Sequence, residues 1–131
     1  MNKLKWPKKQ CRTVKVHLYG SRIYAFNSRK GFEKAVAYMG VDVPNWGTDG
    51  LSLQLENKEN GSSIYLLGVF DGELSTLVHE AAHITQYVAI RAGWESEAGN
   101  GEPFAYLIGH IFKKLEKFVL HTKMEKQNAK D

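Results

Sequence analysis

The residues best suited to chemistry lie in one short segment, His79-Glu80-Ala81-Ala82-His83. Four residues of α-helix turn the chain by about 400°, so we expect His79 and His83 to point the same way, one turn apart. Two imidazoles at this spacing can reach one tetrahedral zinc ion. Glu80 lies about 100° around the same helix, where a general base can take a proton from metal-bound water. The segment therefore predicts a zinc site with an adjacent base.

The surroundings of this segment favour the same interpretation. Residues 74–90 contain no other side chain that is charged near neutral pH, so the helix is apolar nearly all round and we expect it to be buried. A buried carboxylate beside two histidines is costly unless a metal ion or another partner compensates its charge. The competing interpretation is a pair of core histidines bonded to their neighbours, with Glu80 facing solvent.

A catalytic zinc site needs a third protein ligand and an open position for water. The downstream candidates are Glu95, Glu97, Glu102 and His110. Glu102 opens the last predicted helix and is followed by Pro103, a residue favoured in a first helical turn.

The H-E-x-x-H motif resembles that of the zincin metallopeptidases, in particular the gluzincins, in which a glutamate on the next helix completes the site. Residues 102–106 (EPFAY) are also similar to small phage and prophage proteins predicted to be metallopeptidases. This resemblance implies zinc bound by His79, His83 and Glu102, with Glu97 and Glu95 as alternatives to the last. Gluzincins often carry an aspartate four residues after the ligand glutamate, where this chain has Tyr106.

The activity implied by the resemblance is zinc-dependent hydrolysis of peptide bonds, with Glu80 as general base acting on a metal-bound water. The tetrahedral oxyanion needs a further donor. Tyr106 and His110 follow Glu102 at i+4 and i+8, so both are candidates to project towards the site, with a role as core residues as the alternative. The resemblance also implies that the peptide or protein substrate binds as an added strand at a sheet edge, with residues 62–70 lining the cleft.

Other polar residues near the motif have supporting roles in this interpretation. Ser75, Thr76 and Gln86 lie on or near the ligand face and are candidates to bind the histidine ring nitrogens, with simple polar filling as the alternative. Asp71 precedes the helix, and we expect it to cap the helix start.

The elements that must position these residues follow from periodicity and turn signals. Their order predicts one α+β domain over residues 1–131, in which a small, mostly antiparallel sheet packs on the motif helix and the last helix in a minimal zincin-like arrangement. The predicted strands cover 13–20, 21–26, 51–56 and 62–70, and the predicted helices cover 28–39, 73–92 and 102–121.

Composition excludes several other classes. The chain has 131 residues, 43% of them hydrophobic, which is ordinary for one globular domain. Cys11 is the only cysteine, so a disulfide scaffold is excluded. No run approaches 18 apolar residues, and the basic start lacks the apolar stretch of a signal peptide. We therefore expect a cytoplasmic protein without membrane contact, in a bacterium or a phage-infected host.

The net charge of +4 belongs to the two ends of the chain. Residues 1–15 hold six basic and no acidic side chains, and residues 113–131 hold six basic and three acidic ones, which leaves residues 16–112 at −5. We expect a basic arm at 1–12 and a frayed tail at 122–131.

Two functions compete with the peptidase. One is a metal-binding protein of the same fold, encoded by a phage, that acts by binding a host protein without turnover. The other is nucleic-acid binding by the basic ends, where Trp6 lies among lysines and can stack on a base.

Overall fold

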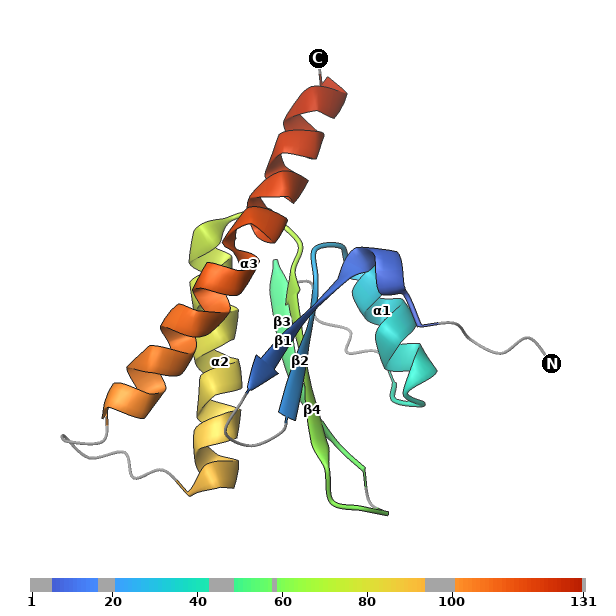
Figure 1. Cartoon of the computed structure of the whole chain (residues 1–131). Coiled ribbons are helices and arrows are strands. Elements are labelled where there is room, and N and C mark those ends of the chain that lie inside the picture. The colour runs from blue at the N-terminus through green and yellow to red at the C-terminus, as the bar shows by residue number, and fades with distance from the viewer. Residues whose placement is uncertain (1–5, 17–20, 43–48, 58, 94–100, 131) are drawn as a thin grey trace.

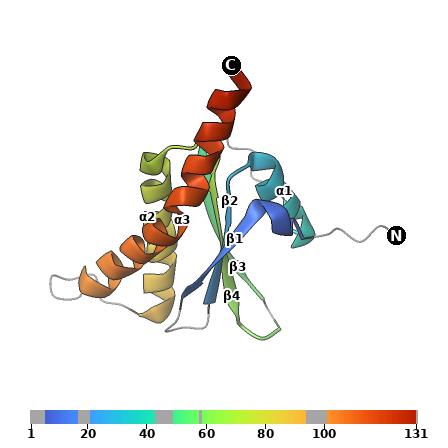
Figure 2. The ribbon, with the colours of Figure 1, turned by 45° about the horizontal axis from the view of Figure 1, so that its top comes forward.

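The structure, a computed structural model, describes residues 6–16, 21–42, 49–57, 59–93 and 101–130. These residues form an α+β fold, as predicted, with a four-stranded sheet between two helical layers (Figure 1). Two helices cover one face of the sheet and the third covers the other, an arrangement that Figure 2 shows from a second direction. The elements in chain order are a 3-10 helix (Lys8–Gln10), β1 (Cys11–Val16), β2 (Ser21–Phe26), α1 (Arg29–Tyr38), β3 (Gly50–Glu56), β4 (Ser63–Val69), α2 (Leu74–Ala92) and α3 (Gly101–Lys130).

The sheet has the strand order β1-β2-β4-β3. β1 pairs with β2 and β3 pairs with β4 in the antiparallel sense, whereas β2 and β4 are parallel. The sheet is therefore mixed, with two antiparallel pairings and one parallel. β4 is paired on both sides, and β3 lies at the edge of the sheet, beside α2.

Element boundaries differ from the sequence predictions mainly at the two ends of the chain. The predicted basic arm is shorter than residues 1–12, because Cys11 and Arg12 pair with β2. Trp6 precedes this strand and makes edge-to-face contacts with three rings, those of Tyr24, Phe26 and Tyr38. At the other end, α3 continues as helix to Lys130, beyond the predicted end at residue 121.

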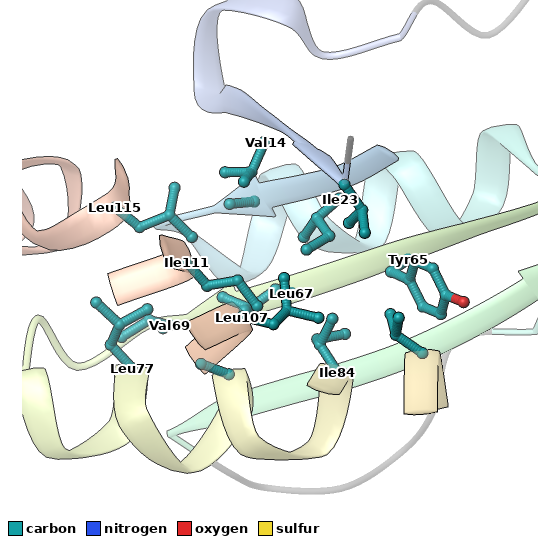
Figure 3. Close-up of a cluster of buried hydrophobic side chains, with 14 of the residues drawn as sticks. Val14, Ile23, Tyr65, Leu67, Val69, Leu77, Ile84, Leu107, Ile111 and Leu115 are labelled. Atoms are coloured by element: carbon teal, nitrogen blue, oxygen red, sulfur yellow. The ribbon is translucent and has the colours of Figure 1, made fainter. Parts of the chain in front are cut away.

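The main core lies between the sheet and the two helices α2 and α3 (Figure 3). α2 contributes Leu77 and Ile84, while α3 contributes Ile111 and Leu115, and all four side chains are fully buried. β1 and β2 contribute Val14 and its cross-strand partner Ile23, among others. Burial of these side chains supplies the hydrophobic free energy that holds both helices against one face of the sheet.

α2 is buried on one side only, which corrects the prediction that it is buried all round. Val78 and Ile90 are exposed, Ile90 to 80%, because the sheet and α3 cover a single stripe of the helix. The sequence shows the stripe poorly because the outer face carries Val78 and Ile90 beside uncharged polar residues such as Ser75 and Gln86. Among the described helices, none is both long and apolar enough to cross a membrane.

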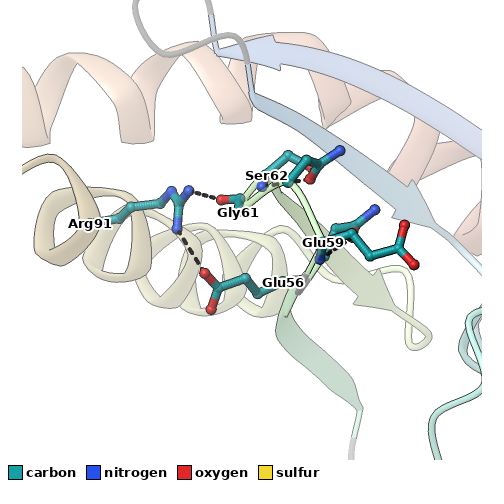
Figure 4. Close-up of polar contacts among 7 residues, drawn as sticks. Glu56, Glu59, Gly61, Ser62 and Arg91 are labelled. Atoms are coloured by element: carbon teal, nitrogen blue, oxygen red, sulfur yellow. Dashed lines mark hydrogen bonds and ion pairs between the residues drawn. The ribbon is translucent and has the colours of Figure 1, made fainter.

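α2 is fixed to the rest of the molecule at both ends. At its start the carboxylate of Asp71 accepts hydrogen bonds from the Glu73 backbone N–H (3.0 Å) and the Thr76 hydroxyl (2.6 Å). Asp71 thus orders the helix start, although Glu73 is the N-cap residue. At the other end Arg91 bonds to the Gly61 carbonyl oxygen and lies 3.8 Å from the Glu56 carboxylate (Figure 4). These contacts join α2 to the turn between β3 and β4.

The orientation of α2 can be tested with a matched pair of isoleucines on this helix. Ile84→Ala should lower the free energy of unfolding by about 2–5 kcal/mol, because it leaves a cavity in the core. Ile90→Ala should change it by less than about 0.5 kcal/mol, since Ile90 is 80% exposed. Urea denaturation of both variants measures the difference, and equal losses would mean that α2 is rotated from the orientation described.

Candidate metal centre

A pocket of about 690 Å³ lies between α2 and the start of β3. The strand side is formed by residues 49–52, which include Asp49. No lysine or arginine is among the described residues that line this pocket, so its formal charge comes from Asp49 and Glu80. This local charge favours a bound cation, in contrast to the net positive charge of the chain. The helix side is formed by Ser75, Thr76, His79, Glu80, His83 and Tyr87.

The two histidines of the motif converge at this pocket as predicted. The Nε2 atoms of His79 and His83 lie 3.2 Å apart, and the rings are nearly perpendicular. Two imidazole ligands at about 2.05 Å from a tetrahedral zinc ion are about 3.3 Å apart, so the pair fits this ion. The same separation also fits an N–H···N hydrogen bond between a protonated ring nitrogen and an unprotonated one.

Glu80 completes a group of three potential ligands. One carboxylate oxygen of Glu80 and one ring nitrogen from each of the two histidines all lie within 4.8 Å of one another. The side chain is only 5% exposed and faces β3, while His79 is open to solvent. Ser52 of β3 places its hydroxyl 3.1 Å from the Glu80 carbonyl oxygen and 3.4 Å from the carboxylate Oε2. The competing interpretation of a solvent-facing Glu80 is therefore wrong.

Burial is the main influence on the acidity of Glu80. Removal of the carboxyl from water raises its pKa, while the nearby His79 and His83 and the Ser52 hydroxyl lower it. The net result is a pKa above the ordinary value for a glutamate. A carboxylate with a raised pKa is a stronger base, which suits general-base chemistry near neutral pH.

Of the three polar residues expected around the histidines, two line the pocket and one does not. Ser75 and Thr76 line the pocket, and the Thr76 hydroxyl donates to Asp71. Gln86 is exposed and does not line the pocket. No hydrogen bond between these three residues and a histidine ring is found among the described side chains.

The structure does not bring Glu102 to the histidines. Glu102 is exposed in the first turn of α3, and Figure 1 shows that this turn lies beside the C-terminal end of α2, whereas the histidines lie in its first half. The apolar stripe of α3, with Leu107 and Ile111, faces the core, so the opposite face that carries Glu102 faces solvent. The first turns of α3 are therefore covered on one face only. Helical periodicity alone does not show which neighbour covers each face.

Tyr106 and His110 also lie away from the pocket. Tyr106 is 78% exposed, and the His110 Nε2 lies 3.3 Å from the Lys15 carbonyl oxygen on β1. β1 is at the opposite edge of the sheet from β3, so neither side chain projects towards His79 or His83. Their prediction as donors to an oxyanion is not met by this geometry. The alternative ligands Glu95 and Glu97 lie outside the described residues.

The strand beside the pocket is β3, and the prediction that residues 62–70 line the cleft is wrong. β4, which occupies most of that range, is paired with β2 along one edge and with β3 along the other. The parallel pairing of β2 with β4 causes this, because it displaces β3 to the edge. Pairing between strands far apart in sequence leaves no local signal.

Sequence reasoning missed three polar residues of the pocket: Asp49, Ser52 and Tyr87. Tyr87 follows His83 by four residues, so its place on the ligand face could have been found from helical spacing. Ser52 lies on the polar side of an alternating strand, but only the fold shows that this side meets α2. Asp49 is the second described carboxylate at the pocket and has no spacing signal.

Metal content can be tested with two substitutions. His83→Ala should abolish binding of one zinc ion per chain, because it removes one of two converging imidazoles. Glu102→Ala should retain the zinc, because Glu102 lies away from the histidines. Elemental analysis after dialysis against zinc measures both. Loss of zinc from Glu102→Ala would show that the first turn of α3 reaches the metal, contrary to this geometry.

The burial of Glu80 predicts a pH-dependent stability in the metal-free protein. Since its pKa is higher folded than unfolded, the folded state binds the extra proton and loses stability as pH rises through the folded pKa. Glu80→Gln removes this loss, so the variant should gain stability relative to the wild type between about pH 4 and pH 8. Urea denaturation at both pH values measures the gain. If the difference in unfolding free energy between the variant and the wild type stays constant with pH, or falls as pH rises, Glu80 is not a buried carboxyl with a raised pKa.

Comparisons with known protein families, with curated proteins and with solved structures gave no match to this chain. Function is therefore inferred from the chemistry of the pocket.

Proposed function

We propose that this protein is a zinc-dependent metallopeptidase, with His79 and His83 as metal ligands and Glu80 as general base. The observation that carries the proposal is the convergence of two imidazoles and one buried carboxylate at the pocket beside an edge strand. Three groups of these types within 4.8 Å of one another suit one cation with an adjacent base. The resemblance of the motif to that of zincins supports the same chemistry.

The reaction follows from the roles of these side chains. His79 and His83 would hold a zinc ion, which would supply a Lewis acid for the scissile carbonyl and the attacking water. Glu80 takes the proton from this water and then donates it to the leaving nitrogen. Burial raises the pKa of Glu80, which strengthens it as a base for the first transfer.

The substrate in this proposal is an extended peptide. Within the described part of the chain no strand pairs with the outer edge of β3, whose first residues line the pocket. A peptide added along this edge would gain main-chain hydrogen bonds that do not depend on its sequence. Its scissile bond would then pass the histidines.

A second candidate is a metal-binding protein that binds a host protein without turnover. One observation favours it: among the described residues, only His79, Glu80 and His83 form a group of potential ligands. If Glu80 acts as a base, the histidines alone leave half of a tetrahedral shell to be filled by other groups.

Turnover of a peptide library by zinc-loaded protein distinguishes the two candidates. Glu80→Gln should lower kcat by roughly 10²–10⁴-fold and retain zinc, because the amide cannot take a proton but leaves both imidazoles in place. Glu59→Gln, an exposed glutamate outside the pocket, serves as the control and should behave as the wild type. Equal turnover by Glu80→Gln and the wild type would overturn the enzyme proposal and leave the metal-binding candidate.

A further inference from the structure

Glu80 is the one acidic side chain that is buried among the described residues, and it is held by a strand. The two ion pairs found in the described part of the chain join Arg29 to Glu33 and Arg91 to Glu56, so no described lysine or arginine neutralises Glu80. A buried carboxylate without a lysine or arginine partner needs hydrogen-bond donors to hold it in one place.

β3 supplies such a donor through Ser52. Gly50, Ser52 and Gln54 alternate with leucines that face the α1 side of the sheet, so these smaller or polar residues face α2. Ser52 is buried, and its Oγ lies 3.1 Å from the Glu80 carbonyl oxygen and 3.4 Å from Oε2. A serine hydroxyl has one proton, so it serves these two acceptors in turn or shares the proton between them.

Gly50 supplies the space that this contact needs. A Cβ at position 50 would lie 2.9 Å from the Glu80 Cγ, 2.8 Å from the Thr76 Cγ2 and 2.8 Å from the Gly68 carbonyl oxygen. No side chain fits there without displacement of backbone, so α2 approaches β3 only because residue 50 is glycine. The start of β3 therefore forms a slot, open at Gly50 and with a donor at Ser52, in which the Glu80 side chain lies.

We infer that Ser52 is a positioning residue for Glu80, which it holds by a hydrogen bond from the edge strand in the orientation needed beside the two imidazoles. The inference rests on the proposed function for its catalytic meaning. That Ser52 contacts Glu80 is a separate claim, which can be tested without peptide cleavage. No hydrogen bond joins Ser52 to either imidazole, so it acts on the base and leaves the metal ligands untouched.

The contact is tested by a double-mutant cycle on the metal-free protein. Unfolding of the wild type, Ser52→Ala, Glu80→Ala and the double variant in urea should show coupling of about fivefold or more in the unfolding equilibrium constant. Ser63→Ala is the matched control, because Ser63 is also buried on this face of the sheet but its hydroxyl has no hydrogen-bond partner. Its coupling to Glu80→Ala should be absent, and absence of coupling for Ser52 would overturn the inference.

The positioning role is tested by kinetics of zinc-loaded variants on a cleaved library peptide. Ser52→Ala should lower kcat by roughly tenfold to a hundredfold, with KM and zinc affinity within about twofold of the wild type. Ser52→Thr keeps the hydroxyl and should restore most of kcat, while Ser63→Ala should match the wild type. A purely structural role for Ser52 would leave kcat unchanged, and this result would overturn the inference. If the wild type cleaves no peptide, the proposed function fails, and the coupling alone decides whether Ser52 orients Glu80.

Discussion

The close approach of α2 to the start of β3 is the constraint on which the rest of the site depends. It is possible because residue 50 has no side chain, where a Cβ would come within 3.0 Å of the helix and of β4. With the helix seated there, Glu80 enters the interface between helix and strand, and His79 and His83 face the pocket beside the sheet edge. Asp71 at one end of α2 and Arg91 at the other hold the helix in this position.

Local patterns predicted most of the fold. The strand at 21–26 was predicted at the observed bounds. The helix predicted at 28–39 is observed over Arg29–Tyr38, and the Ser28 hydroxyl caps it by accepting a hydrogen bond from the Gly31 N–H. Periodicity and capping depend on residues that are close in sequence, so they can be predicted without knowledge of the tertiary structure. The parallel pairing of β2 with β4 joins residues about forty apart in sequence, and no pattern specified it.

In the candidate site, too, the features within one element were predicted and those between elements were not. The spacing of His79 and His83 on one helix was sufficient to predict their convergence, because both lie on one rigid element. The placement of Glu102 depended on which face of α3 meets α2, and Ser52 depended on which side of β3 does. Both are properties of packing between elements. Glu102 was therefore predicted at the pocket and lies in solvent, whereas Ser52 was not predicted and lies against Glu80.

The central claim is that His79 and His83 bind one cation through their Nε2 atoms. Nitrogen-15 NMR of the imidazole rings during a zinc titration tests it most directly, because each ring nitrogen reports its own protonation and metal ligation. We predict that both Nε2 resonances move to metal-bound values and saturate at one zinc per chain, while those of His110 and His121 stay unchanged. Unmoved resonances of His79 and His83, or retention of a proton on either Nε2 in excess zinc, would contradict the claim.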